Sequence, residues 1–153
     1  MLALALFAGA CQNPTAPSFS LDELLTAPVA IDIDGRTFTL ETYVWRDFMP
    51  PSEPAGSLLA VVVYLTAVDG QPFPGKIDAT RLWVVHGQEI WETTFVEESR
   101  PRSPARQDQL EKSAAGGPRW DVGAEVDVVV RVTVSASVPR LLRATKQMIG
   151  KTV

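Results

Sequence analysis

The chain has 153 residues and a formal net charge of −4, a length that suits one domain with its own core. No stripe of lysine and arginine accompanies this acidic balance, which argues against nucleic-acid binding. A single cysteine excludes an intramolecular disulfide and a thiolate metal cluster, and no cofactor is predicted.

The first ten residues, 1–10, contain no charged or polar side chain. A helix of ten residues is about 15 Å long, half of the roughly 30 Å hydrocarbon core, so this segment is too short to span a membrane. Its length, and the small residues before Cys11, are typical of a signal peptide. Residues 11–19 contain Pro14 and Pro17 and predict a flexible tether. The alternatives are an ordinary cleaved signal peptide and a short apolar helix packed on the core, with Cys11 buried as a small hydrophobe.

The motif Ala8-Gly9-Ala10-Cys11 resembles the lipobox of bacterial lipoproteins. The resemblance implies cleavage before Cys11, a lipid on its thiol and attachment to a membrane. Because Gln12 rather than aspartate follows, the resemblance implies the outer membrane of a Gram-negative cell, facing the periplasm. The predicted organisation is a signal peptide (1–10), a tether (11–19) and one domain (20–153).

The domain is predicted to begin with a short helix and to continue as strands. Ser20 and Glu23 form a capping-box pattern, so one or two helical turns should end before Pro28. Residues 29–45 predict a hairpin around Asp34-Gly35, with apolar residues alternating along it. Residues 57–70 are apolar on both faces through position 63, as in a central strand.

The second half of the domain is also predicted to be β-structure. Residues 80–96 predict a hairpin with His86-Gly87 at or near its tip, and residues 97–117, rich in charge and proline, predict a long loop. Residues 124–136 predict a strand with five inward valines, among them Val130. Residues 140–149 predict a last strand, with a terminal helix as the competing interpretation.

About seven strands with turns at short spacing predict an all-β fold, a single antiparallel β-sandwich. The segment from Trp120 to Gly123, followed by the valine strand and a last strand, resembles the final hairpin of immunoglobulin-like and fibronectin-like domains. The resemblance implies a generic sandwich, because the paired cysteines and the tyrosine corner of antibody domains are absent from the sequence.

The sequence offers little for catalysis. His86 is the only histidine, and a zinc site normally needs three or four histidine or cysteine ligands. Asp32 and Asp34 share a strand face beside a turn, a pattern that suits calcium ligation or an ordinary acidic strand end. Paired carboxylates elsewhere would suit a small hydrolase. The chain is therefore predicted to be no enzyme, with a carboxylate hydrolase as an alternative.

The aromatic residues are the predicted binding residues. If Val44 points inward, Tyr43 and Trp45 point outward on the same strand. Aromatic residues and arginine are frequent at binding hot spots. The candidate ligand-binding residues are Tyr43, Trp45, Arg46, Trp83 and Trp91. The alternative is that most of the tryptophans cap the core.

Together these patterns predict a lipid-anchored binding or structural module of the cell envelope. Its predicted partners are the membrane, through Cys11, and a protein or polysaccharide of the envelope. A domain that binds an envelope polysaccharide or peptide through exposed aromatics is the nearest alternative.

Overall fold

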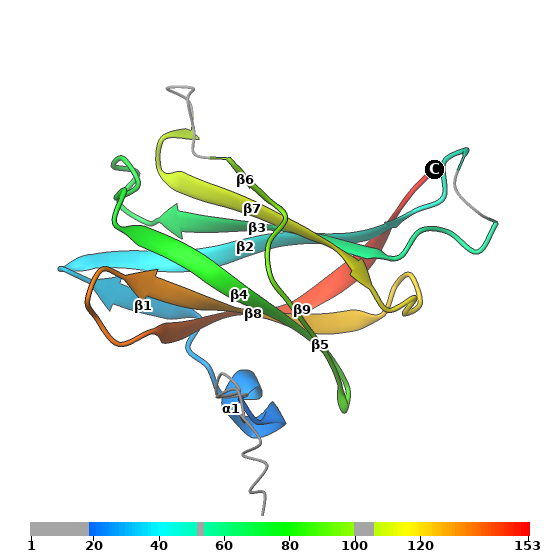
Figure 1. Cartoon of the computed structure of the whole chain (residues 1–153), viewed down its shortest axis with the longest axis horizontal. Coiled ribbons are helices and arrows are strands. Elements are labelled where there is room, and N and C mark those ends of the chain that lie inside the picture. The colour runs from blue at the N-terminus through cyan, green and yellow to red at the C-terminus, as the bar shows by residue number, and fades with distance from the viewer. Residues whose placement is uncertain (1–18, 52–53, 100–105) are drawn as a thin grey trace, which may run out of the picture.

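The computed structural model describes residues 19–51, 54–99 and 106–153, and it confirms an all-β fold with one short helix (Figure 1). The elements are α1 (Leu21–Leu25), β1 (Ala30–Ile33), β2 (Arg36–Asp47), β3 (Leu59–Ala67), β4 (Ile77–His86), β5 (Glu89–Thr93), β6 (Glu97–Ser99), β7 (Gln109–Gly117), β8 (Glu125–Val134) and β9 (Arg140–Thr152).

The strands form one curled, mixed sheet with the order β5-β4-β8-β9-β2-β3-β7-β6, and β1 pairs with β2. β9 joins the two halves of this sheet: it pairs antiparallel with β8, and its last residues run parallel to β2, with Val44 opposite Ile149. The expectation of a purely antiparallel sheet was therefore wrong at this junction. The other strand pairs of the described chain are antiparallel.

The inner faces of both halves share one apolar core. Val126, Val128, Val130 and Val132 of β8 are all at most 2% exposed, which confirms the predicted inward face of this strand. Inward residues of β2, β3, β4 and β9 complete the cluster. Its largest fully buried side chains are Ile31, Phe38, Leu59, Leu65, Ile77, Leu82, Leu110, Leu142 and Ile149.

A second, smaller cluster lies on the outer face of the β4–β8–β9 half. There Trp83, Val85 and Val129 point away from the main core and are covered by Leu24 and Ala27, from α1 and the turn after it. The predicted capping box starts this helix, since Ser20 and Glu23 each accept a hydrogen bond from the other's backbone amide. The protein therefore uses its one described helix to cover apolar surface on this half of the sheet.

The segment 97–117 differs most from its prediction as a loop, because it contains β6 and β7. The inward positions of β7 hold Leu110, Lys112 and Ala114, so a lysine interrupts the apolar alternation that would identify a strand. Both predicted hairpins form, and residues 140–149 belong to strand β9, so the alternative of a terminal helix was wrong.

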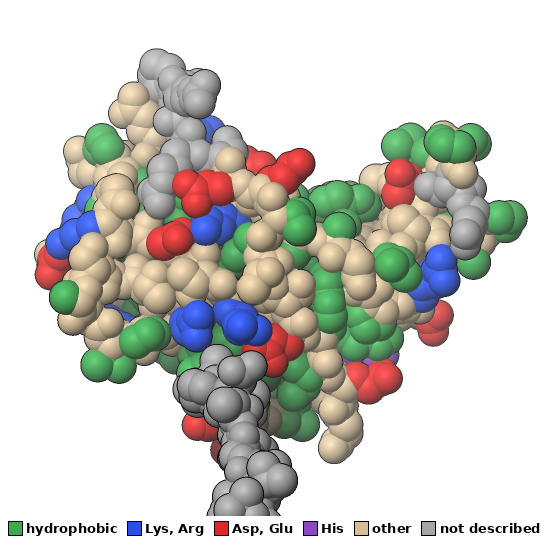
Figure 2. Space-filling model, in the orientation of Figure 1, with side chains coloured by type: hydrophobic (Ala, Val, Ile, Leu, Met, Phe, Trp, Pro, Cys, Tyr) green, Lys and Arg blue, Asp and Glu red, His purple; other side chains and the backbone are tan. Residues whose placement is uncertain are grey.

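Exposed hydrophobic residues gather at one end of the sheet. Met49 follows β2, Leu58 directly precedes β3, and Val153 is the last residue of the chain. Each of these three side chains is at least 44% exposed. Figure 2 shows hydrophobic side chains, with a few charged ones among them, at the end where the C-terminus lies, and a mixture of both kinds over the rest of the visible face. This apolar end lies beside the last residues of β2, which carry Trp45.

Candidate functional site

The candidate site is the outer face of the half-sheet formed by β2, β3, β7 and the end of β9, called the open face below. Val44 is 2% exposed and inward, so Tyr43 and Trp45 point outward as predicted. Cross-strand pairing places Ala60 and Val62 of β3 opposite Trp45 and Tyr43. The outward residues at the centre of the open face are Tyr43, Trp45, Ala60, Val62, Ser113, Ala115, Met148 and Gly150, and Tyr64 continues the same face of β3.

Tyr43 and Trp45 form the centre of the open face. Their rings are stacked, with centroids 5.0 Å apart and an interplanar angle of 21°. Tyr43 is 48% exposed and extends over β9, since a Cβ added at Gly150 would lie 3.7 Å from its Oη. Each ring covers one face of the other, so the two rings do not make a continuous flat platform.

The helix α1 covers the apolar residues of the other outer face, whereas Tyr43 on the open face is 48% exposed. Met148, next to Tyr43 in the parallel register, is 66% exposed. Large contiguous apolar patches are rare on the surface of soluble proteins, and where they occur they usually mark an interaction site. The open face is therefore the strongest candidate binding surface of the described chain.

Carboxylates surround the open face. Along β2, Glu41 lies two residues before Tyr43, and Asp47 lies two residues after Trp45. On the flanks, Glu97 of β6 pairs with Ser113, and Glu125 of β8 pairs with Met148. The backbone amide of Met49 and the Thr152 hydroxyl donate to Asp47 and hold the pKa of its carboxyl below the usual range, so Asp47 is ionised at neutral pH.

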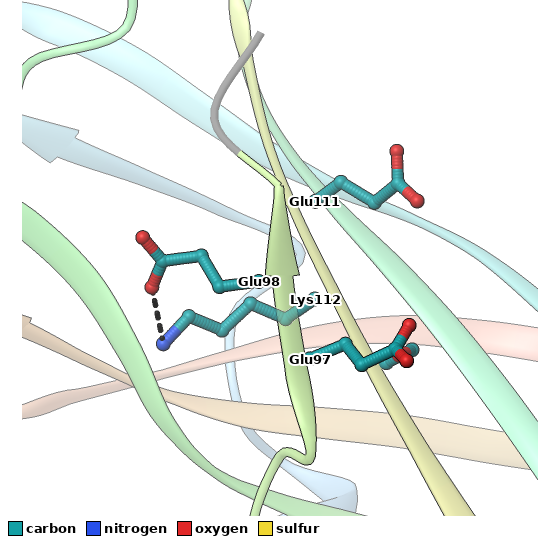
Figure 3. A pocket seen from close by; sticks show the side chains of 5 residues that line it. Glu97, Glu98, Glu111 and Lys112 are labelled. Atoms are coloured by element: carbon teal, nitrogen blue, oxygen red, sulfur yellow. Dashed lines mark ion pairs between the residues drawn. The ribbon is translucent and has the colours of Figure 1, made fainter.

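Glu111 of β7 adds a fifth carboxylate to this border. In Figure 3, Glu97 and Glu111 extend to one side of the β6–β7 hairpin, and Glu98 and Lys112 extend to the other. Glu111 pairs with Tyr64 of β3. Tyr64 lies two residues along that strand from Val62, so both are on the open face. The hairpin thus separates the carboxylates of the open face from the charged groups that face inward.

The inward charged group is Lys112, which is 8% exposed. Its Nζ lies 2.6 Å from Asp78 of β4 and 3.1 Å from Glu98 of β6, and 5.6 Å from the ring centroid of Phe95. These contacts join β6 and β7 to β4, across the curl of the sheet. A pocket at this hairpin, lined by Glu97, Glu98, Glu111, Lys112 and Ser113, has a volume of about 60 Å³, well below the roughly 300 Å³ of a small ligand site.

Three of the five predicted binding residues, Arg46, Trp83 and Trp91, pack within the structure and do not form an exposed binding surface. Arg46 is 6% exposed and donates hydrogen bonds to the backbone carbonyls of Ser57, Trp120 and Ala55. Trp83 is 1% exposed and lies beneath α1. The structure therefore brings only Tyr43 and Trp45 together among these five candidates.

Trp91, the last of the five, is half-buried where β5 approaches β7. Its ring would lie 2.6 Å from a Cβ added at Gly117, so only glycine allows this approach without displacing the ring. The remaining tryptophan, Trp120, is 8% exposed and belongs to the core cluster. The interpretation that most tryptophans cap the core thus describes Trp83, Trp91 and Trp120, and Trp45 is the exception.

The other chemical candidates have local partners. Asp32 accepts a hydrogen bond from Thr37, and Asp34 pairs with Lys76. His86 lies at the predicted hairpin tip, 3.5 Å from Glu89 and with its ring 5.0 Å from that of Trp120. In the described ranges, no group of three or more histidine, cysteine or acidic residues is arranged to hold a metal ion.

The N-terminal predictions, including lipidation of Cys11, lie outside the described residues. Among the helices that are described, none is long and apolar enough to cross a membrane. No family model, curated protein or solved structure matches the chain. The functional conclusion therefore depends on the N-terminal motif and on the geometry of the open face.

Proposed function

We propose that the chain is a lipid-anchored, non-catalytic binding module of the cell envelope, attached through Cys11 and bound to a protein partner through the open face. The lipobox-like motif and the tether support the anchor. We also propose that the two halves of the sheet act as the layers of an immunoglobulin-like β-sandwich, a view supported by the apolar core that they share.

The observation that carries the binding role is the difference between the two outer faces. Both present aromatic and aliphatic side chains, but α1 covers those of one face, whereas Tyr43 and Met148 of the other are exposed. Exposure of Tyr43 and Met148 leaves apolar surface in water, which is unfavourable by roughly 25 cal/mol for each Å². A partner that covers the open face would recover this free energy.

A protein partner fits the open face better than a polysaccharide. Sugar rings stack on the free, flat faces of aromatic rings, and here Tyr43 and Trp45 stack on each other. The neighbouring residues, Ala60 and Val62, are aliphatic and offer few hydrogen bonds to sugar hydroxyls. Aliphatic and aromatic side chains of a protein can pack against such a surface and exclude water from it.

Site-specific photo-crosslinking in intact cells tests the binding role. A photoreactive phenylalanine analogue in place of Val62, at the centre of the open face, should give a discrete crosslinked protein adduct after irradiation. The same analogue in place of Ile90, which is 39% exposed on β5, is the matched control and should give none. The adduct at position 62 should fall at least tenfold when Trp45→Ala is added.

Two outcomes would contradict this proposal. One is the absence of any adduct at position 62 when the protein is folded and present in the envelope. The other is an equally strong adduct at positions 62 and 90, because contact would then not depend on the open face.

A further inference from the structure

We propose that the partner segment is a cationic peptide that places lysine or arginine residues on both sides of apolar side chains. This inference rests on the proposed binding role of the open face and goes further by naming the chemistry of the partner. Two independent features carry it: the partly exposed apolar centre, in which Tyr43 and Met148 are the most exposed side chains, and the carboxylates on every side of that centre.

The carboxylates enclose the apolar centre in both directions of the sheet. Glu41 and Asp47 lie beyond its two ends along β2. Glu125 lies beyond Met148 on one flank, and Glu97 lies on the other. Among the described residues, one ion pair involves these four carboxylates: the guanidinium of Arg106 lies 4.0 Å from the carboxylate of Glu41. The border is therefore acidic and largely uncompensated, and it attracts positive charge.

The enclosed area suits a peptide segment. Five inter-strand steps of about 4.8 Å separate Glu125 from Glu97, which is roughly 24 Å. Six residues at about 3.3 Å each separate Glu41 from Asp47, which is roughly 20 Å. An area of about 500 Å² is smaller than the roughly 800 Å² that each partner buries in a standard interface between globular proteins. It matches a segment of about six extended residues, or a helix of similar length.

The same charges argue against the other occupants of an apolar face. A second copy of this chain, packed face to face, would bring two acidic borders together without compensating cations, and like charges in an interface are unfavourable. An anionic membrane surface would be repelled for the same reason, because such surfaces attract basic segments. In a cationic segment with an apolar side, the cations can pair with the carboxylates of the border and the apolar side chains can pack on the centre.

Three labelled model peptides of equal length test this inference on the purified full chain in detergent. The first alternates lysine with leucine, the second alternates glutamate with leucine, and the third alternates lysine with glycine. We expect fluorescence anisotropy to show saturable binding of the lysine–leucine peptide, at least tenfold tighter than that of the other two. Binding should weaken with added sodium chloride, because salt screens the charged border.

Variants identify the surface that binds. Trp45→Ala should weaken binding of the lysine–leucine peptide at least tenfold. The double variant Glu97→Gln/Glu111→Gln should weaken binding of this peptide about threefold or more and reduce the salt dependence of that binding. The matched control Asp22→Asn/Glu89→Gln removes the same charge from α1 and β5, away from the open face, and should change binding less than twofold. Circular dichroism verifies that each variant is folded.

Equal binding of the glutamate–leucine peptide that still depends on Trp45 would overturn the charge inference and leave the binding role intact. Failure of the lysine–leucine peptide to bind, or equal effects of the two double variants, would also overturn it. The crosslinking experiment in cells decides the binding role separately, since it makes no assumption about the charge of the partner.

Discussion

Val130→Asp is expected to unfold the domain. Val130 is fully buried on β8 and lies between Leu82 of β4 and Leu142 of β9, both also fully buried. A carboxylate at this position would have no cation or hydrogen-bond donor among these neighbours, and burying it costs several kcal/mol. Since a domain of this size is stable by about 5–15 kcal/mol, most of that stability should be lost.

Far-UV circular dichroism and urea denaturation measure this effect. Thr145→Asp is the matched control: it places the same side chain on the exposed surface of β9 and should change the free energy of unfolding by no more than about 0.5 kcal/mol. A Val130→Asp protein with a wild-type unfolding transition would show that the inward face of β8 is assigned incorrectly.

Cys11→Ser is expected to move the protein from the membrane fraction to the soluble fraction. Each buried methylene of a lipid chain contributes about 0.8 kcal/mol, and stable attachment needs at least two anchoring signals, which a fully acylated lipoprotein cysteine provides. Without this thiol no lipid is added, and ten apolar residues are too short to span the bilayer. Fractionation should therefore show nearly complete release, and labelling with a fatty acid should be lost.

The conservative tether variant Thr15→Ser is the control for the anchor and should keep both the membrane location and the label. Uncleaved, unlabelled native protein in the cytoplasm would contradict the lipoprotein assignment. Because the peptide experiment uses purified protein, its outcome does not depend on this result.

Local features of the fold were predictable because they depend on residues that are near in sequence. The turn at Asp34-Gly35 has φ angles of 51° and 78°, the left-handed conformation that this residue pair favours in hairpins. The capping box of Ser20 and the alternation of β8 follow equally from neighbouring residues. Each of these patterns specifies a structure without knowledge of the rest of the chain.

Features that depend on long-range pairing were not predictable. The parallel contact of β2 with β9 joins residues about one hundred positions apart, and no local pattern encodes it. β7 was missed because Lys112 occupies an inward position, and only its contacts with Asp78 and Glu98 explain why a lysine is tolerated there.

The candidate site was predictable only in part, for the same reason. Alternation along β2 places Tyr43 and Trp45 outside, but the partners Val62 and Met148 come from strands whose neighbours the sequence does not reveal. Arg46 was a plausible binding residue by type, and only the fold shows that its guanidinium donates to three backbone carbonyls.

The proposed partner should cover the open face in the cell envelope. The most direct test compares the rate at which a small maleimide modifies Met148→Cys in intact cells and in the purified protein. Position 148 is 66% exposed in the isolated domain, and Val138→Cys, at an 84% exposed position between β8 and β9, is the control. If a partner covers the open face, labelling of Met148→Cys should be at least tenfold slower in cells, with no change for Val138→Cys. Equal labelling of Met148→Cys in cells and in the purified protein would contradict it.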